Sequence, residues 1–108
     1  MARSPSRWRP PAPLPEREAD FQRKVVKLAR DLGWCVRHER VSVWAVPGWP
    51  DLFCLRPRDG RVLALELKGT GGTLTAAQTA YLETLNACGI LAVAAWPEDW
   101  DWLVELLR

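Results

Sequence analysis

The feature that most constrains the fold is residues 50–68, which read PDLFCLRPRDGRVLALELK. Two short apolar runs, 51–55 and 62–67, flank an Arg-Asp-Gly tripeptide. Asp-Gly between alternating hydrophobic residues is the strongest short-range signal for a β-hairpin. The sequence therefore predicts a hairpin here, with Asp59 and Gly60 as its two-residue turn.

The register of this hairpin decides which side chains meet. A two-residue turn places Leu52 opposite Leu67 and Asp51 opposite Lys68. Because alternate side chains of a strand share one face, Asp51, Glu66 and Lys68 are expected on the same face. Glu66 is then the diagonal neighbour of Asp51, roughly 7–8 Å away between backbone positions. The open end of an otherwise apolar hairpin thus gathers two carboxylates and one ammonium.

Two carboxylates held together in a partly dry site repel each other unless a proton, a lysine or a metal ion offsets their charge. Oxygen ligands from Asp51, Glu66 and the Leu67 backbone carbonyl suit Mg²⁺ or Mn²⁺, whereas Zn²⁺ prefers Cys and His. The chemistry indicated is metal-assisted hydrolysis of a phosphodiester. The metal would activate a water, and Lys68 would orient that water or stabilise the developing charge.

A plainer interpretation competes with this site, because a Glu-X-Lys tripeptide usually marks the solvated face of an edge strand. Two observations favour the site. Pro50-Asp51 precedes Glu66 by one strand-turn-strand length. The apolar residues around Glu66 also indicate a central, buried strand, where charges rarely lie without a function.

Length and charge describe one domain with a basic half. With 108 residues, 48% of them hydrophobic, the chain is expected to form a single domain over 16–108. Residues 1–61 carry 13 Lys/Arg against 7 Asp/Glu, and residues 62–108 carry 2 against 6. A basic half suits a polyanionic partner, although a solvated surface explains it nearly as well.

Residues 1–15 are predicted to be a disordered, basic, proline-rich arm, since they hold five prolines, three arginines and no acid. Arg3, Arg7 and Arg9 would follow a phosphate backbone while Trp8 stacks on a base. A solvated tail without a role is an equally good interpretation.

The cysteines and apolar runs indicate the compartment. Cys35, Cys54 and Cys88 show no metal-ligand spacing and are interpreted as small core residues in a reducing compartment. The longest apolar run, 90–96, is too short to cross a bilayer, and the N-terminus has no signal-peptide apolar region. We expect a cytoplasmic protein with no membrane partner.

A helix is predicted over 16–32, because apolar residues recur there at helical spacing and Gly33 follows. Its apolar stripe also contains Glu18. In the first turn, Glu18 complements the helix dipole, or it hangs over the hairpin as a third carboxylate; the sequence leaves both open.

A second helix begins at the capping box Thr75-Ala-Ala-Gln78 and ends near Gly89. Gln78 is first a cap residue and second a candidate that faces the active centre. Strands are predicted at 34–38 and 90–96, the latter buried on both sides, and a last helix at 98–107. The order α-β-β-β-α-β-α is typical of an α/β fold in which helices flank a mixed sheet.

These residues together resemble the PD-(D/E)xK nuclease superfamily. The order is Glu18 in a first helix, Pro50-Asp51, Glu66-Leu67-Lys68, and then a helix with Gln78. More narrowly, the sequence is similar to the virus-type replication-repair nuclease (VRR-NUC) domain. The motifs that carry this likeness are GWPDL at 48–52, ALELKG at 64–69, LTAAQ at 74–78 and Gly89 ahead of a strand. The resemblance covers about residues 18–107 and leaves the arm outside.

The resemblance implies a restriction-endonuclease-like core and a Mg²⁺- or Mn²⁺-dependent DNA endonuclease without a small-molecule cofactor. Asp51 and Glu66 match the metal-binding acids, Lys68 the motif lysine, Glu18 the acid of the first helix and Gln78 the family glutamine. Stand-alone members are similar to Holliday-junction resolvases and act as homodimers. The expected partner is therefore branched DNA, in DNA repair.

Other functions stay open at this point. The same chemistry would serve on flaps, nicks, single strands or RNA. A non-cleaving DNA-binding or assembly module would use the same fold, although such a module has no reason to hold two acids against a polyanion. Trp44 and Trp49 would stack on bases or fill a subunit interface, with core packing as the default interpretation.

Overall fold

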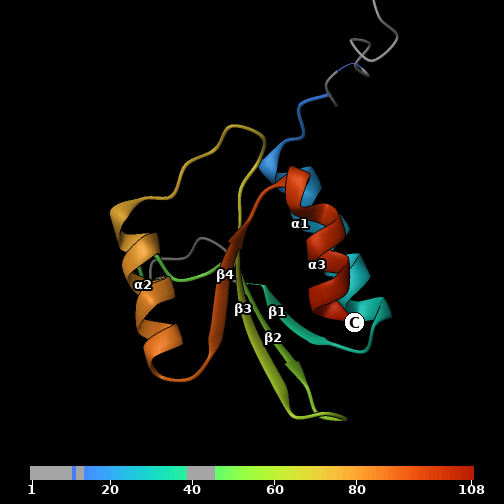
Figure 1. Ribbon diagram of the computed structural model, residues 1–108, viewed down its shortest axis with the longest axis vertical. Helices are drawn as coiled ribbons and strands as arrows, with labels where there is room; N and C mark the ends of the chain where they lie inside the picture. Colours follow the sequence, from blue (N-terminus) through green and yellow to red (C-terminus); the bar gives the residue numbers. More distant parts are fainter. Residues whose placement is uncertain (1–10, 12–13, 39–45) are drawn as a thin grey trace, which may run out of the picture.

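The structure is a computed structural model that describes residues 11, 14–38 and 46–108 (Figure 1). Its four-stranded sheet has the order β1-β2-β3-β4, with β1–β2 and β2–β3 antiparallel and β3–β4 parallel. The strands are β1 (Cys35–His38), β2 (Leu52–Arg56), β3 (Arg61–Leu67) and β4 (Leu91–Ala95). The helices are α1 (Glu18–Asp31), α2 (Ala76–Ala87), the 3-10 helix η2 (Pro97–Asp99) and α3 (Trp100–Leu107).

The helices form a layer on each side of the sheet. α1 and α3 lie together on one side and α2 lies on the other (Figure 1). This arrangement confirms the predicted α/β class, the mixed sheet and the element order. None of the helices in the described ranges is long and apolar enough to cross a membrane.

The hairpin is confirmed, but its predicted register is wrong by two residues. Leu52 faces Leu65 and Arg56 faces Arg61, so the loop has four residues, 57–60. Pro57 has no N–H to continue the ladder, and Gly60 takes φ 67° while its N–H donates to the Pro57 carbonyl. A shift of two keeps every side chain on its predicted face, because side chains alternate with period two.

The larger core lies between the sheet and the α1–α3 layer. Phe21, Val25 and Ala29 follow one another at four-residue spacing and are fully buried. They pack with Leu103 and Leu107 of α3 against the sheet. β3 is an interior strand, buried from Leu63 onward, which confirms the expectation of a central strand around Glu66.

One burial prediction is confirmed and one is wrong in part. Both faces of β4 are covered, since Val93 and Ala95 pack in the core under α1 and α3 and Ala92 and Ala94 pack beside α2, although Leu91 at the start of the strand is 44% exposed. Cys54 is a core residue, but Cys35 and Cys88 are exposed; all three are free thiols. The predictions for Arg3, Arg7, Trp8, Arg9 and Trp44 fall on residues outside the described ranges and stay predictions.

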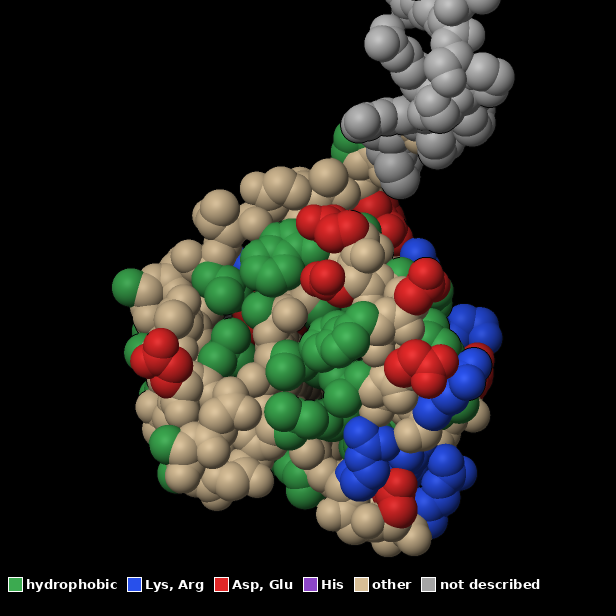
Figure 2. Space-filling model, viewed as in Figure 1, with side chains coloured by type: hydrophobic (Ala, Val, Ile, Leu, Met, Phe, Trp, Pro, Cys, Tyr) green, Lys and Arg blue, Asp and Glu red, His purple; other side chains and the backbone are tan. Residues whose placement is uncertain are grey.

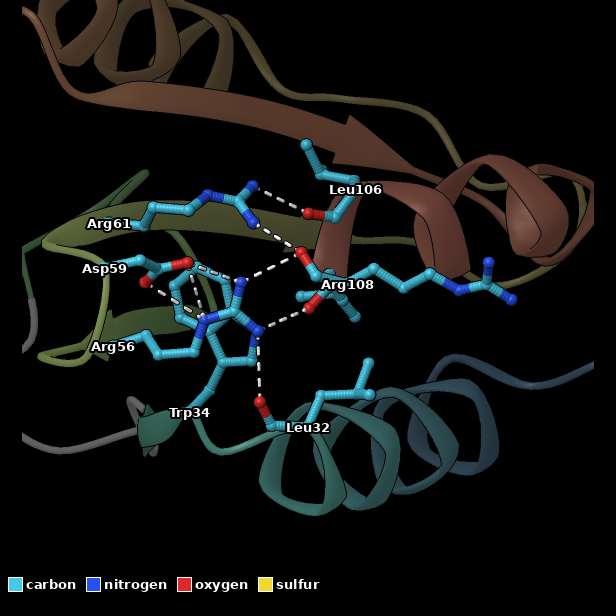
Figure 3. Close-up of polar contacts among 8 residues, drawn as sticks. Leu32, Trp34, Arg56, Asp59, Arg61, Leu106 and Arg108 are labelled. Atoms are coloured by element: carbon cyan, nitrogen blue, oxygen red, sulfur yellow. Dashed lines mark hydrogen bonds and ion pairs between the residues drawn. The ribbon is translucent and has the colours of Figure 1, made fainter.

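A buried guanidinium joins three elements at the end of the sheet remote from the acids. Arg56 is 2% exposed and donates to the carbonyls of Leu32, Leu107 and Arg108 and to the Asp59 carboxylate (Figure 3). These carbonyls end α1 and α3, where helices leave acceptors unsatisfied. Arg56 therefore ties both helix ends to the hairpin.

Candidate active site

Asp51 and Glu66 meet where β2 and β3 begin to separate. The observed register, extended by one pair, sets Asp51 directly opposite Glu66 and not opposite Lys68 as predicted. The Asp51 N–H donates to Glu66 Oε2 at 3.1 Å, and the Leu67 N–H donates to Asp51 Oδ2 at 2.9 Å. Glu66 thus binds the backbone of Asp51, and Asp51 binds the backbone of the residue that follows Glu66.

This pairing follows from where the backbone ladder stops. Pro50 has no N–H and cannot extend an antiparallel ladder. Beyond the last pair of the ladder, Leu52 and Leu65, the carboxylates of Glu66 and Asp51 accept the N–H groups of Asp51 and Leu67. Glu66 is 2% exposed and Asp51 is half-buried, so the acid pair is fixed at the edge of the core.

Gln78 has both of the roles that the sequence left open. Its Oε1 accepts from the Thr75 N–H and the Thr75 hydroxyl accepts from the Gln78 N–H, which completes the predicted capping box. Its Nε2 donates to Glu66 Oε1 at 2.8 Å. The cap therefore fixes the amide group that orients Glu66.

Lys68 lies on the same side of the hairpin end. Its Nζ is 3.8 Å from Glu66 Oε1, and its side chain is 12% exposed. An ammonium in this position offsets part of the charge of the acid pair. The structure thus brings together four of the five predicted site residues: Asp51, Glu66, Lys68 and Gln78.

Glu18 lies at the rim of this group and not inside it. It is exposed in the first turn of α1, and it shares with Lys68 the lining of a cavity of about 530 Å³. Its charge reaches Glu66 and adds a small part to the rise of the Glu66 pKa. In residues 11, 14–38 and 46–108, no cluster of three or more Asp, Glu, His or Cys side chains is arranged to hold a metal ion.

Burial, and next the neighbouring Asp51 carboxylate, raise the pKa of Glu66 from its ordinary 4.5 to about 7. Lys68 opposes the rise but does not cancel it. At neutral pH the site therefore holds a carboxyl group that takes up either a proton or a cation.

A pH dependence of folding follows from this pKa. Between pH 4.5 and about 7 the folded chain binds more protons at Glu66 than the unfolded chain does. The stabilisation is complete below pH 4.5 and is lost as the pH rises through about 7, by about 3 kcal/mol at most. The test is denaturant unfolding in the presence of a chelator at pH 5 and at pH 8. We expect the free energy of unfolding of the wild type to fall between these pH values by more than that of Glu66→Gln.

The comparison uses the change with pH, because glutamine at position 66 turns an amide toward Gln78 and alters absolute stability. The exposed Glu83 of α2 gives the matched variant, Glu83→Gln, which should follow the wild type. Parallel curves for wild type and Glu66→Gln would contradict the raised pKa.

Two glycines that the sequence did not single out for this purpose bring the helices to the site. A Cβ on Gly48, at φ 86°, would lie 2.5 Å from the Ala77 carbonyl carbon in the first turn of α2. A Cβ on Gly69 would lie 2.7 Å from the Glu18 nitrogen in the first turn of α1. Only glycine permits either approach. Both residues stand inside the quoted motifs, but the contact they permit is readable only in three dimensions.

Trp49 is a packing residue, which confirms the default interpretation. Its ring stacks on Phe53 at 6.2 Å and meets Tyr81 edge-on at 5.6 Å, beside the smaller core under α2. The aromatic group fixes the backbone just before Asp51.

A mixed sheet flanked by helices, with acids at the open end of its central hairpin, defines a restriction-endonuclease-like nuclease fold. The chain belongs to the VRR-NUC domain family, whose model it matches over residues 4–96. The match thus begins within the arm that the sequence resemblance left outside.

A solved structure described as "VRR_NUC domain" is similar to this chain, with a TM-score of 0.67 and 26% sequence identity. The similarity covers 82% of this chain and 94% of that one. No curated protein gives a significant match. A VRR-NUC domain is a nuclease-type domain, which implies DNA as the substrate.

Proposed function

We propose that this chain is a Mg²⁺- or Mn²⁺-dependent endodeoxyribonuclease that selects branched DNA and works as a homodimer. The observation that carries the proposal is the reciprocal binding of Asp51 and Glu66 at the hairpin end, with Lys68 beside them. A purely structural role does not account for two fixed acids that face each other, one of them almost fully buried.

The donor set fits a hard divalent cation. Asp51 and Glu66 supply carboxylate oxygens, and the Leu67 carbonyl is on the same side of β3 as the N–H that binds Asp51. These are oxygen donors, which Mg²⁺ and Mn²⁺ prefer. When bound, such a metal supplies Lewis-acid activation of a phosphate oxygen and of a water.

The other residues act around that centre. The Lys68 ammonium is placed to orient a nucleophile or to stabilise negative charge on the phosphate. Gln78 keeps the Glu66 carboxylate oriented from the end of α2. Glu18, at the rim of the site, is proposed as the acid of the first helix.

Exposed cations on α1 support DNA as the partner. Arg23, Lys27 and Arg30 follow one ridge of the helix and, with His38, line a cavity of about 710 Å³; Arg23 pairs with Asp20 and Lys27 with Asp31 on the same helix. A basic ridge binds phosphates without regard to base sequence. The visible face in Figure 2 has the opposite character around α3, where acidic side chains dominate.

The homodimer is proposed from the symmetry of the substrate. A four-way junction has two-fold related scissile phosphates, and a two-fold dimer presents two matching sites. Hydrophobic side chains gather in the middle of the face shown in Figure 2, and Leu91 and Trp102 are 44% and 46% exposed. Exposed apolar residues of this size suit a subunit contact.

The three free thiols favour a cytoplasmic protein.

The test is cleavage of a labelled four-way junction, and separately of linear duplex, flap and single strand, in Mg²⁺ or Mn²⁺. We expect paired symmetric nicks in the junction alone, and a rate about 10²–10³-fold lower for Lys68→Ala because charge stabilisation is lost. Cleavage of flaps or single strands would retain the nuclease and exclude the resolvase. Tight binding without cleavage in any metal would favour the non-cleaving module.

A further inference from the structure

The loop after Lys68 is hydrogen-bonded to Glu16, which precedes the N-cap residue of α1. The Thr70 N–H donates to the Glu16 carbonyl at 2.9 Å, and the Glu16 N–H donates to Thr70 Oγ1 at 2.9 Å. This pair of reciprocal bonds joins segments that are 54 residues apart in the chain. These two hydrogen bonds fix the position of the loop after Lys68 relative to the start of α1.

The same loop is held on its other side. The Gly72 carbonyl accepts from Trp96 Nε1 at 2.7 Å, and the Gly72 N–H donates to the Gly69 carbonyl at 3.0 Å. The stem of Lys68 packs over Gly72, since a Cβ there would lie 3.3 Å from Lys68 Cβ. The loop is therefore hydrogen-bonded to Trp96 on one side and to the segment before α1 on the other. The Lys68 side chain lies across it.

The contact between this loop and the start of α1 brings Glu18 and Lys68 to the same cavity. Gly69 allows the close approach to the Glu18 nitrogen, and the Thr70–Glu16 bonds keep it. Glu18 and Lys68 then line one cavity together with Thr70 and Thr73. Arg17, the N-cap of α1, makes no side-chain cap bond, so the start of this helix depends on Thr70 for its position.

We infer that Thr70 is a positioning residue: its hydroxyl holds Glu16, just before α1, so that Glu18 stays at the rim of the site, in the cavity that it shares with Lys68. The inference rests on the proposed function for its effect on catalysis, but the clamp itself does not. Groups that orient a metal site from outside alter metal affinity or activity by about 10–100-fold when removed.

The test variant is Thr70→Val, which keeps the shape and the backbone bond but removes the acceptor for the Glu16 N–H. Amide hydrogen exchange of Glu16, just before α1, should rise about five-fold, the effect of one net hydrogen bond. Affinity for Mn²⁺ alone, by calorimetry, and the cleavage rate should each fall about 10-fold. Thr70→Ser, which keeps the hydroxyl, should restore both, and Thr84→Val on α2 is the matched control.

A double-mutant cycle links the effect to Glu18. If Thr70 acts through Glu18, Thr70→Val should add little to the loss caused by Glu18→Gln. Additive losses, or unchanged Mn²⁺ affinity and cleavage in Thr70→Val, would overturn the positioning role. Unchanged exchange would overturn the clamp. A wild type that neither binds Mn²⁺ nor cleaves DNA would instead overturn the proposed function, and the positioning role with it, while raised exchange in Thr70→Val would still establish the clamp.

Discussion

Asp51→Asn is expected to lower DNA cleavage about 10³-fold or more while DNA binding stays intact or becomes tighter. The Leu67 N–H binds one Asp51 oxygen, and asparagine retains an oxygen for that bond. The fold of the hairpin end is therefore preserved while one negative charge is lost. A divalent ion contributes several kcal/mol of charge stabilisation in the transition state, which corresponds to such a factor in rate.

The expected gain in DNA affinity has the same origin. A carboxylate beside a phosphate repels it, so removing the charge favours binding even as cleavage fails. Single-turnover cleavage and a binding titration on the same junction separate the two effects. Asp101→Asn is the matched control, because Asp101 is an exposed aspartate in the first turn of α3 and is not one of the candidate site residues. Equal cleavage by Asp51→Asn and Asp101→Asn would refute the assignment of the acid.

The hairpin shows why much of this site was predictable. The side chain of every strand residue alternates, so a register error of two residues left Asp51, Glu66 and Lys68 on one face. The error lay in the turn, where Asp59-Gly60 suggested two loop residues but Pro57 ended the ladder earlier. It changed which partner faces Asp51, and the observed partner is the second acid.

What the sequence could not provide is contact between distant segments. Nothing in the local pattern around Gln78 states that its amide reaches Glu66, although the capping box was readable. The Thr70–Glu16 bonds join segments whose proximity depends on the whole sheet. The sequence of the first turn of α1 likewise did not decide whether Glu18 is exposed to solvent or lies within the acid group. The structure places it at the rim of that group.

Arg56 was missed for a related reason. Arginine at the end of a strand is usually a surface residue, and nothing in the local sequence indicates that Arg56 is buried. Its burial depends on Leu107 and Arg108, about fifty residues further on, whose carbonyls accept its N–H groups. Trp34 lies under the guanidinium, with the Arg56 Cζ 4.5 Å from the ring centroid. An aromatic face and three carbonyls make a site that suits only a planar cation.

Arg56→Met is expected to lower the free energy of unfolding by about 1–3 kcal/mol, the cost of leaving a hydrogen-bond acceptor inside the protein without its donor. Methionine fills much of the volume but leaves the Leu32 carbonyl without its Arg56 donor, whereas the Leu107 carbonyl keeps the hydrogen bond from Trp34 Nε1. The Asp59 carboxylate also loses the hydrogen bond that holds its pKa below the ordinary value. Because Asp59 is 38% exposed and returns to water, most of the loss comes from the carbonyls.

Two variants separate geometry from charge in a denaturant titration at pH 7. Arg58→Met removes an exposed arginine of the same turn and should change stability by less than about 0.5 kcal/mol. Arg56→Lys keeps the charge but cannot serve three carbonyls and a carboxylate from one planar fork, so it should recover only part of the loss. Full recovery by lysine would mean that charge alone stabilises this end of the sheet. In that case the hydrogen bonds to the ends of α1 and α3 would not be the reason that arginine stands there.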